Sequence, residues 1–167
     1  MIIQATMENL EEVLSIIEPI KKELLKTNNL QWGSTEDNYP NASQFENDIK
    51  NKSLYVYKED NLIKGVISVS VDTGYYDELL ENSPKKSYIL HRLAIKKEFR
   101  NQDIANKLLQ FCEDLAINNN IEILKGDTEE KNTKMNNLFL KFGYQKIGEF
   151  EYDDYPGHYI YYEKEIR

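Results

Sequence analysis

The apolar and polar positions along the chain follow two different patterns. Some segments alternate or form the short apolar runs typical of strands, and longer segments repeat apolar residues every three or four positions, as helices do. The expected strands are Ile2–Ala5, Leu54–Lys58, Ile63–Val71, Ser87–Lys96, Ile121–Gly126, Tyr144–Phe150 and His158–Ile166. Their order predicts a mixed α/β fold, with a central sheet of about seven strands flanked by helices.

The helical pattern occurs in four places. Helices are expected after Thr6, after Ser43, over Asp103–Asn118 and over Thr133–Phe142. Thr6 and Ser43 are interpreted as N-caps, and Pro19 is expected to break the first helix because proline has no backbone N–H to donate. Pro156 and Gly157 predict the turn between the last two strands.

One unit has the order strand, helix, strand, which predicts that Ser87–Lys96 and Ile121–Gly126 are parallel and joined by a right-handed crossover. The 167 residues contain no repeat, low-complexity tract or linker. A single domain over residues 1–167 is therefore expected. The connection from Asp72 to Lys86 is long, and loops of this length inside a domain are often functional.

Composition excludes several classes of function. The net charge of −8 disfavours nucleic acid and anionic membrane surfaces as partners, since both need a basic surface. The only cysteine, Cys112, lies on the apolar face of a predicted helix and is interpreted as a buried thiol. No segment has the pattern of a signal peptide or membrane span, so a cytoplasmic location is expected. No His or Cys spacing indicates a metal site.

The segment RNQDIANKLL, Arg100 to Leu109, places a short loop between a strand and a helix. In this geometry backbone N–H groups point to one place and the helix dipole adds partial positive charge, which favours an anion such as a pyrophosphate. An ordinary turn, in which Asp103 caps the helix, explains the same residues.

The surrounding residues resemble a known family. HRLAIKKEFRNQDIANKLLQFCEDLA, followed by ILKGDTEEKNTKMNNLFLKFGYQKIG, is similar to the GNAT superfamily of acetyl-CoA-dependent N-acetyltransferases. The order of elements matches over residues 87 to 150, and the QW and YP pairs between Gln31 and Ile49 resemble small bacterial members. The resemblance implies that the two parallel strands splay apart, and that the strand containing Leu93 carries a bulge.

The resemblance also implies a binding site for acetyl-CoA. Leu93, Ala94 and Ile95 would bond the pantetheine arm, and Asn132 would bond the cofactor, with Met135 and Phe139 packing beside it. The pyrophosphate would be held by Arg100, Asn101, Gln102, Asp103, Ile104 and Ala105. Two positions depart from the family pattern: Asp103 replaces a glycine, and Phe139 replaces a tyrosine that protonates the leaving thiolate. Asp103 is expected to turn inward and cap its own helix, which would limit its repulsion of the phosphates.

Transfer to an amine needs a proton acceptor, and both His91 and Asp127 are candidates. A strand-face histidine and a turn aspartate are the structural alternatives. Trp32, Tyr39, Tyr76, His91 and Tyr155 are expected to wall the cleft of the acceptor, a small-molecule or peptide amine. The acidic residues near Tyr155 would suit a cationic acceptor, although a solvated hairpin explains them too.

The expected function is therefore an N-acetyltransferase, acting as a monomer or homodimer. A catalytically weak GNAT-like module that senses acyl-CoA is the alternative, because Asp103 and Phe139 both depart from the family pattern.

Overall fold

The computed structural model describes residues 1–76 and 85–166, and the described strands form one seven-stranded sheet in the order β1-β2-β3-β4-β5-β7-β6. The strands are β1 (Ile2–Gln4), β2 (Leu54–Glu59), β3 (Leu62–Val71), β4 (Ser87–Ile95), β5 (Ile123–Glu129), β6 (Gln145–Tyr152) and β7 (Tyr155–Glu165). Only β4 and β5 pair in parallel, and the other neighbours are antiparallel. The predicted mixed α/β fold is confirmed.

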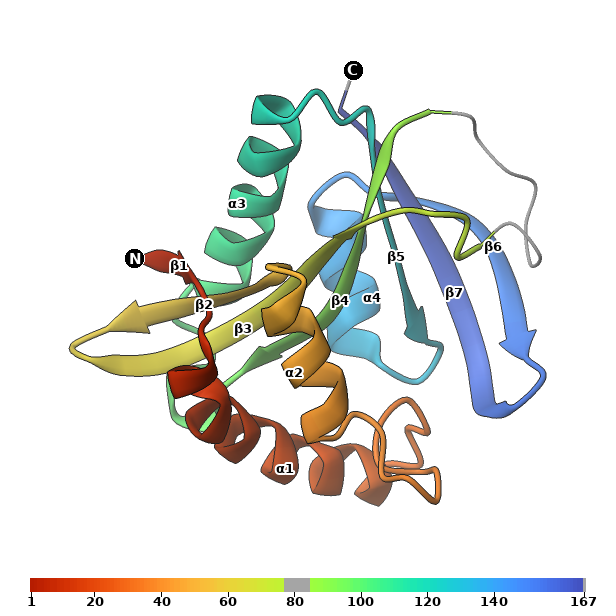
Figure 1. The fold of residues 1–167 in the computed structure, drawn as a ribbon. Coiled ribbons are helices and arrows are strands. Elements are labelled where there is room, and N and C mark those ends of the chain that lie inside the picture. The colour runs from red at the N-terminus through yellow and green to blue at the C-terminus, as the bar shows by residue number, and fades with distance from the viewer. Residues whose placement is uncertain (77–84, 167) are drawn as a thin grey trace.

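Four α-helices pack on the two faces of this sheet. They are α1 (Leu10–Lys26), α2 (Ala42–Lys50), α3 (Ile104–Asn118) and α4 (Thr133–Lys141), and short 3-10 turns lie at Met7–Asn9 and Lys97–Phe99. Figure 1 shows α1 and α2 together on one face, with α3 and α4 on the other. Two separate apolar clusters match this arrangement: one joins α1 and α2 to β2 and β3, and the other lies beneath α3 and α4.

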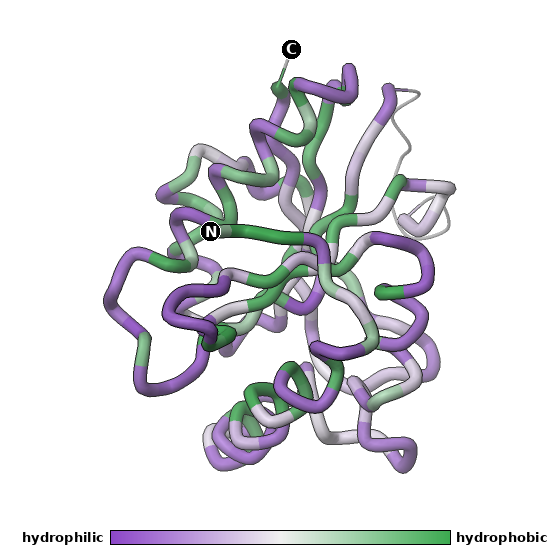
Figure 2. Tube along the Cα trace, turned by 60° about the vertical axis from the view of Figure 1, so that its left-hand side comes forward, coloured by the Kyte–Doolittle hydropathy of each residue, from purple (hydrophilic) through white to green (hydrophobic). Residues whose placement is uncertain are grey.

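Hydropathy follows the same arrangement. In Figure 2 the hydrophobic segments concentrate in the strands at the centre of the molecule, and the hydrophilic segments lie mainly in the peripheral connections. Among the described helices, none is long and apolar enough to span a bilayer.

The two parallel strands separate after a short contact. Ser87–Ile89 pairs with Ile123–Lys125, and beyond this point β4 bonds only to β3 while β5 bonds only to β7. Figure 1 shows β4 and β5 diverging from their shared end. The predicted parallel pairing and the implied splay are therefore both confirmed.

A bulge lies in β4 beside this opening. Val66 pairs with Ala94 and Ser68 pairs with His91, so the single residue Ile67 faces two residues of β4. Arg92, one of these two, has a positive φ of 52°. Such an extra residue leaves the regular ladder and bends the strand, which is the bulge that the family resemblance implied.

Three local predictions were wrong. Pro19 lies inside a continuous α1, and Asn41 rather than Ser43 caps α2 by accepting a bond from the Ser43 N–H at 2.9 Å. Pro156 and Gly157 belong to β7, and the turn falls at residues 153 and 154. Much of the long connection after Asp72 lies outside the described residues.

Candidate active site

A cavity of about 1500 Å³ reaches residues of both diverging strands, β4 and β5. It exceeds the 300 to 1,000 Å³ that is usual for one small ligand, so two molecules can lie in it together. The residues singled out from the sequence that line it are Trp32, Tyr39, His91, Leu93, Ala94, Ile95, Arg100, Asn101, Asp103, Ile104, Ala105, Asp127, Asn132, Met135, Phe139 and Tyr155. Gln102 and Tyr76 do not line it.

The lining falls into two parts of different character. The helix half consists of Leu93–Ile95 and the lining residues of 99–106 and 131–139, around the starts of α3 and α4. The tyrosine half consists of Tyr39, Tyr75, Tyr152, Tyr155 and Tyr159, with Asp37, His91, Arg92, Asp127 and Asp154.

The helix half contains a loop of unusual backbone conformation. Asn101 and Asp103 have positive φ angles of 62° and 68°. Glycine is the default residue there, and Asn and Asp are the other residue types that tolerate it best. This explains how the chain keeps the loop geometry without glycine.

This loop leaves a group of backbone donors free. The N–H of Lys107 bonds to the Asp103 carbonyl, but the N–H groups of residues 101–106 have no protein acceptor in the described part of the chain. With the dipole of the 15-residue α3 behind them, these donors form a site for an anion.

The expectation that Asp103 caps its own helix was wrong in detail. Its side chain bonds no backbone N–H and instead accepts a bond from the amide of Asn106. The carboxylate is thus held in the first turn of α3, while the backbone donors remain available.

Arg100 anchors the same loop to α1. Its guanidinium donates two hydrogen bonds to the carboxylate of Glu23, at 3.0 and 2.8 Å. These hydrogen bonds are the main reason why the pKa of Glu23 is lowered. Because this guanidinium is already engaged, Arg100 positions the loop and its charge adds to the local field.

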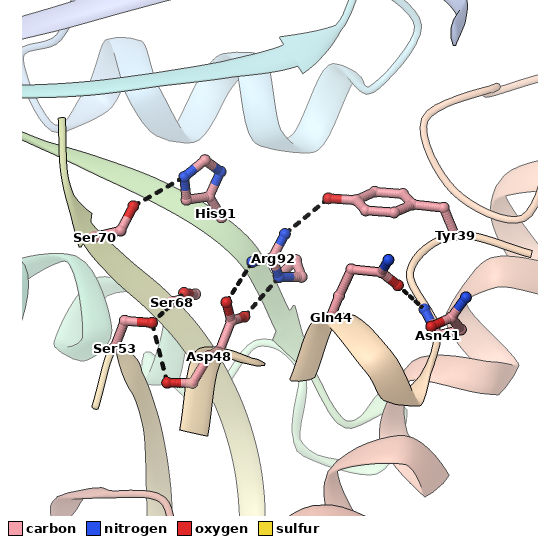
Figure 3. Close-up of polar contacts among 9 residues, drawn as sticks. All are labelled: Tyr39, Asn41, Gln44, Asp48, Ser53, Ser68, Ser70, His91 and Arg92. Atoms are coloured by element: carbon pink, nitrogen blue, oxygen red, sulfur yellow. Dashed lines mark hydrogen bonds and ion pairs between the residues drawn. The ribbon is translucent and has the colours of Figure 1, made fainter. Parts of the chain in front are cut away.

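Arg92 plays a comparable part in the tyrosine half (Figure 3). Its Nε and Nη2 donate to the two oxygens of Asp48 at 2.8 and 2.6 Å, and its Nη1 donates to the Tyr39 hydroxyl at 2.8 Å. Both members of the ion pair are largely buried. The side chain of the bulge residue therefore ties β4 to α2 and to the loop that carries Tyr39. Sequence reasoning missed this pair, although an aspartate on the apolar face of a short helix was a usable signal.

Asp127 lies at the buried end of the tyrosine half. Its Oδ2 accepts hydrogen bonds from the hydroxyls of Tyr76 at 2.6 Å and Tyr152 at 3.2 Å, and the Tyr75 and Tyr152 hydroxyls are 3.0 Å apart. Burial raises the pKa of Asp127 to about 6, against the opposing effect of the two hydrogen bonds. A carboxyl group with this pKa is an effective proton acceptor near neutrality.

The other candidate acceptor, His91, is in a less favourable state. Burial, together with the charge of Arg92, lowers its pKa to about 3, and its Nε2 lies 3.2 Å from the Ser70 hydroxyl. The imidazole is therefore neutral at physiological pH, and protonation of the ring is strongly disfavoured. This makes it a weak base.

A buried ion pair holds the tyrosines near Asp127. Lys125 donates to Oδ2 of Asp72 at 2.6 Å, and Oδ1 of Asp72 accepts bonds from the N–H groups of Gly74 and Tyr75 at 2.9 and 3.1 Å. These bonds of Asp72 therefore hold the turn before Tyr76 in place. No sequence motif indicated this contact, because the two partners are 53 residues apart.

Asn132 and Phe139 line the helix half of the cavity, and both also hold the structure together. Asn132 caps α4 by accepting a bond from the Met135 N–H at 3.2 Å. Phe139 is buried and stacks on Tyr162 with ring centres 4.8 Å apart. Gln31 joins β5 to the start of α4, since its Oε1 accepts bonds from the Thr128 hydroxyl at 2.9 Å and from the Asn132 amide at 3.4 Å.

Comparisons with known proteins agree with this architecture. The profile of the Acetyltransferase (GNAT) family matches residues 19–144. A GNAT-family acetyltransferase from Streptococcus agalactiae shares 29% identity and a TM-score of 0.85, covering 99% of this chain and 94% of that one. No curated protein matches the chain.

More distant structures share the fold. A GNAT-family acetyltransferase from Listeria monocytogenes has 17% identity and a TM-score of 0.78, covering 99% of this chain and 94% of its own. The ribosomal-protein-alanine N-acetyltransferase from Brucella melitensis has 16% identity and a TM-score of 0.74, covering 99% of both chains. The profile match extends over most of the chain, and the chain therefore belongs to the acetyltransferase (GNAT) family.

Proposed function

We propose that this acetyltransferase moves an acetyl group from acetyl-CoA to a primary amine, with Asp127 as the proton acceptor. The observation that carries the proposal is the position of Asp127 in the cavity. A partly buried carboxyl group with a pKa raised to about 6 lies in the same cavity as a loop of free backbone donors.

The helix half fits the donor substrate. The N–H groups of residues 101–106 would hold its pyrophosphate, and the open side of the bulge at Arg92 and Leu93 would bond its pantetheine arm. Arg100 would keep the loop in place through Glu23. Acetyl-CoA supplies an acetyl thioester, whose carbonyl carbon is the target of attack.

The tyrosine half supplies proton transfer. An aliphatic amine with a pKa near 10.4 is almost entirely protonated at pH 7, so it must lose a proton before it can attack. Asp127 would take that proton, directly or through one water. The nitrogen would then form its bond to carbon as the bond to sulfur breaks, and it would lose its second proton to water. Tyr76 and Tyr152 would hold the carboxylate in one orientation.

Phe139 offers no hydroxyl to the leaving thiolate. A thiol with a pKa near 8.5 is a fair leaving group without a proton donor. We therefore propose that the sulfur departs as thiolate and takes its proton from water.

An assay of thiol release tests the proposal. Purified protein is incubated with acetyl-CoA and a panel of primary amines, and the acetylated product is identified by mass spectrometry. Transfer to at least one amine, lost in Asp127→Asn but retained in His91→Asn, is the expected result. Binding of acetyl-CoA without transfer to any amine would instead support the sensor function, and no binding at all would contradict both.

A further inference from the structure

The wall of the tyrosine half is built from aromatic rings that contact one another. Tyr39 and Tyr155 lie edge to face with ring centres 5.5 Å apart, and Tyr152 links Tyr155 at 6.1 Å to Tyr75 at 6.4 Å. All four rings line the cavity. Aromatic faces attract cations and also pack well against methylene chains.

The charges in this half are predominantly negative. Asp127 is partly buried, and Asp37 and Asp154 are exposed residues of the same lining. None of these three carboxylates forms a salt bridge within residues 1–76 and 85–166. Burial is the main reason why the pKa of Tyr155 is raised, and the charge of Asp37 adds to the rise, so Asp37 acts on the aromatic wall.

Among the described residues, the one cation of the tyrosine half, Arg92, is already paired with a carboxylate. Arg92 donates three of its five N–H groups to Asp48 and Tyr39, so its positive charge is already paired with the carboxylate of Asp48. Lys131 directs its ammonium to the carbonyl of Asn28 at 3.5 Å. The tyrosine half thus offers a ligand aromatic faces and uncompensated carboxylates.

We propose that the acceptor is an aliphatic amine with a second cationic group, whose reacting nitrogen lies near Asp127 and whose other charge lies near Asp37 and Asp154. The methylene chain between them would pack along the four tyrosine rings. This inference rests on the proposed transfer to an amine and adds the class of substrate.

Three acceptors of equal carbon number test the substrate class. Cadaverine, pentylamine and δ-aminovalerate carry the same reacting amine and end in an ammonium, a methyl group and a carboxylate. The kcat/KM for cadaverine should exceed that for pentylamine by roughly two- to fivefold, since an exposed ion pair contributes at most about fivefold. δ-Aminovalerate should be the poorest, because its carboxylate meets like charge.

Variants of two adjacent aspartates locate the second charge. Asp154→Asn should lower the preference for cadaverine over pentylamine roughly threefold, while Asp153→Asn should leave it unchanged because Asp153 does not line this cavity. Asp154→Lys should raise kcat/KM for δ-aminovalerate and lower it for cadaverine. Because Asp154 is an exposed turn residue, its variants should remain folded, and thermal melting verifies this.

The outcomes separate this inference from the proposed function. Transfer with equal kcat/KM for the three acceptors, or with δ-aminovalerate as the best, would overturn the inference and leave the transferase intact. Calorimetric binding of cadaverine that weakens in Asp154→Asn, without transfer to any amine, would support the inference and overturn the proposed transfer.

Discussion

The two halves of the cavity use different parts of the chain. The helix half presents mainly backbone N–H groups, and two of its charged side chains, Arg100 and Asp103, are engaged with Glu23 and Asn106. The tyrosine half presents side chains: phenol rings and hydroxyls, and the carboxylate of Asp127. A site built from backbone tolerates changes of side chain that leave the loop conformation intact. A site built from side chains does not, and the following predictions test this difference.

The largest effect is expected at Asp127. Asp127→Asn removes the proton acceptor while keeping the size of the side chain, so kcat/KM should fall by about 10² to 10⁴-fold. In the wild type, kcat/KM should rise with pH through the pKa of about 6, because only the ionised carboxylate accepts a proton, and should then level off. The measurement is the pH profile of thiol release, and an unchanged acid limb in the variant would exclude Asp127 as the base.

The next effect tests the helix half by filling it. Ala105 lies in the first turn of α3 and lines the cavity, so Ala105→Trp should block the donor substrate and weaken its binding by at least about 100-fold, or about 2.7 kcal/mol. The domain should remain folded, because Ala105 is only half-buried. Calorimetric titration with CoA checks the affinity, and circular dichroism checks the fold. Unchanged affinity would mean that this loop is an ordinary helix start.

The ion pair between Arg92 and Asp48 is expected to stabilise the folded state. Asp48→Asn would leave the Arg92 guanidinium largely buried without its ion-pair partner, which should lower the free energy of unfolding by about 3 kcal/mol. Glu46→Gln, on the exposed side of the same helix, is the matched control and should change it by less than about 0.5 kcal/mol. Urea unfolding measures both. Equal changes in the free energy of unfolding for the two variants would show that the ion pair contributes no specific stability.

Asp127, which has the largest expected effect on activity, should also have a smaller effect on stability. Because the folded-state pKa of Asp127 is raised to about 6, the folded state favours the protonated form, and stability falls as pH rises from about 4 to 6. Asp127→Asn should therefore be more stable than wild type above pH 6, by about 2 kcal/mol, and not below pH 4. Urea unfolding at several pH values measures the difference, and a difference that did not change with pH would contradict it.

The smallest effect is expected where the sequence departs most visibly from its family. Asp103→Gly removes a negative charge near the anion site and suits the positive φ of 68°, so affinity for CoA should stay similar or improve by up to about tenfold. Calorimetric titration compares the variant with wild type. Loss of binding would show that the Asp103 side chain itself is part of the site.

Much of the fold could be predicted because the pattern of apolar residues reports burial directly. The strand–helix–strand unit from Ser87 to Glu129 was recognisable from periodicity, and its parallel pairing followed from the order of its elements. Element ends were less predictable: Pro19 is accommodated inside α1, and Asn41 caps α2 in place of Ser43. At such positions several residue types satisfy the same backbone requirement, so a local signal does not choose among them.

The sequence by itself determined the mixed α/β class and the loop before α3, whose Asn and Asp tolerate the positive φ angles there. These are local properties, since a short segment carries both the hydrophobic period and the backbone preference. Only the tertiary structure decided the state of the polar side chains. Asp127 acquires a pKa of about 6 from burial beside tyrosines that are distant in sequence, Arg92 is paired with Asp48, and Lys125 holds the turn at Asp72. Burial and pairing depend on contacts between distant segments, and these exist only when the chain is folded.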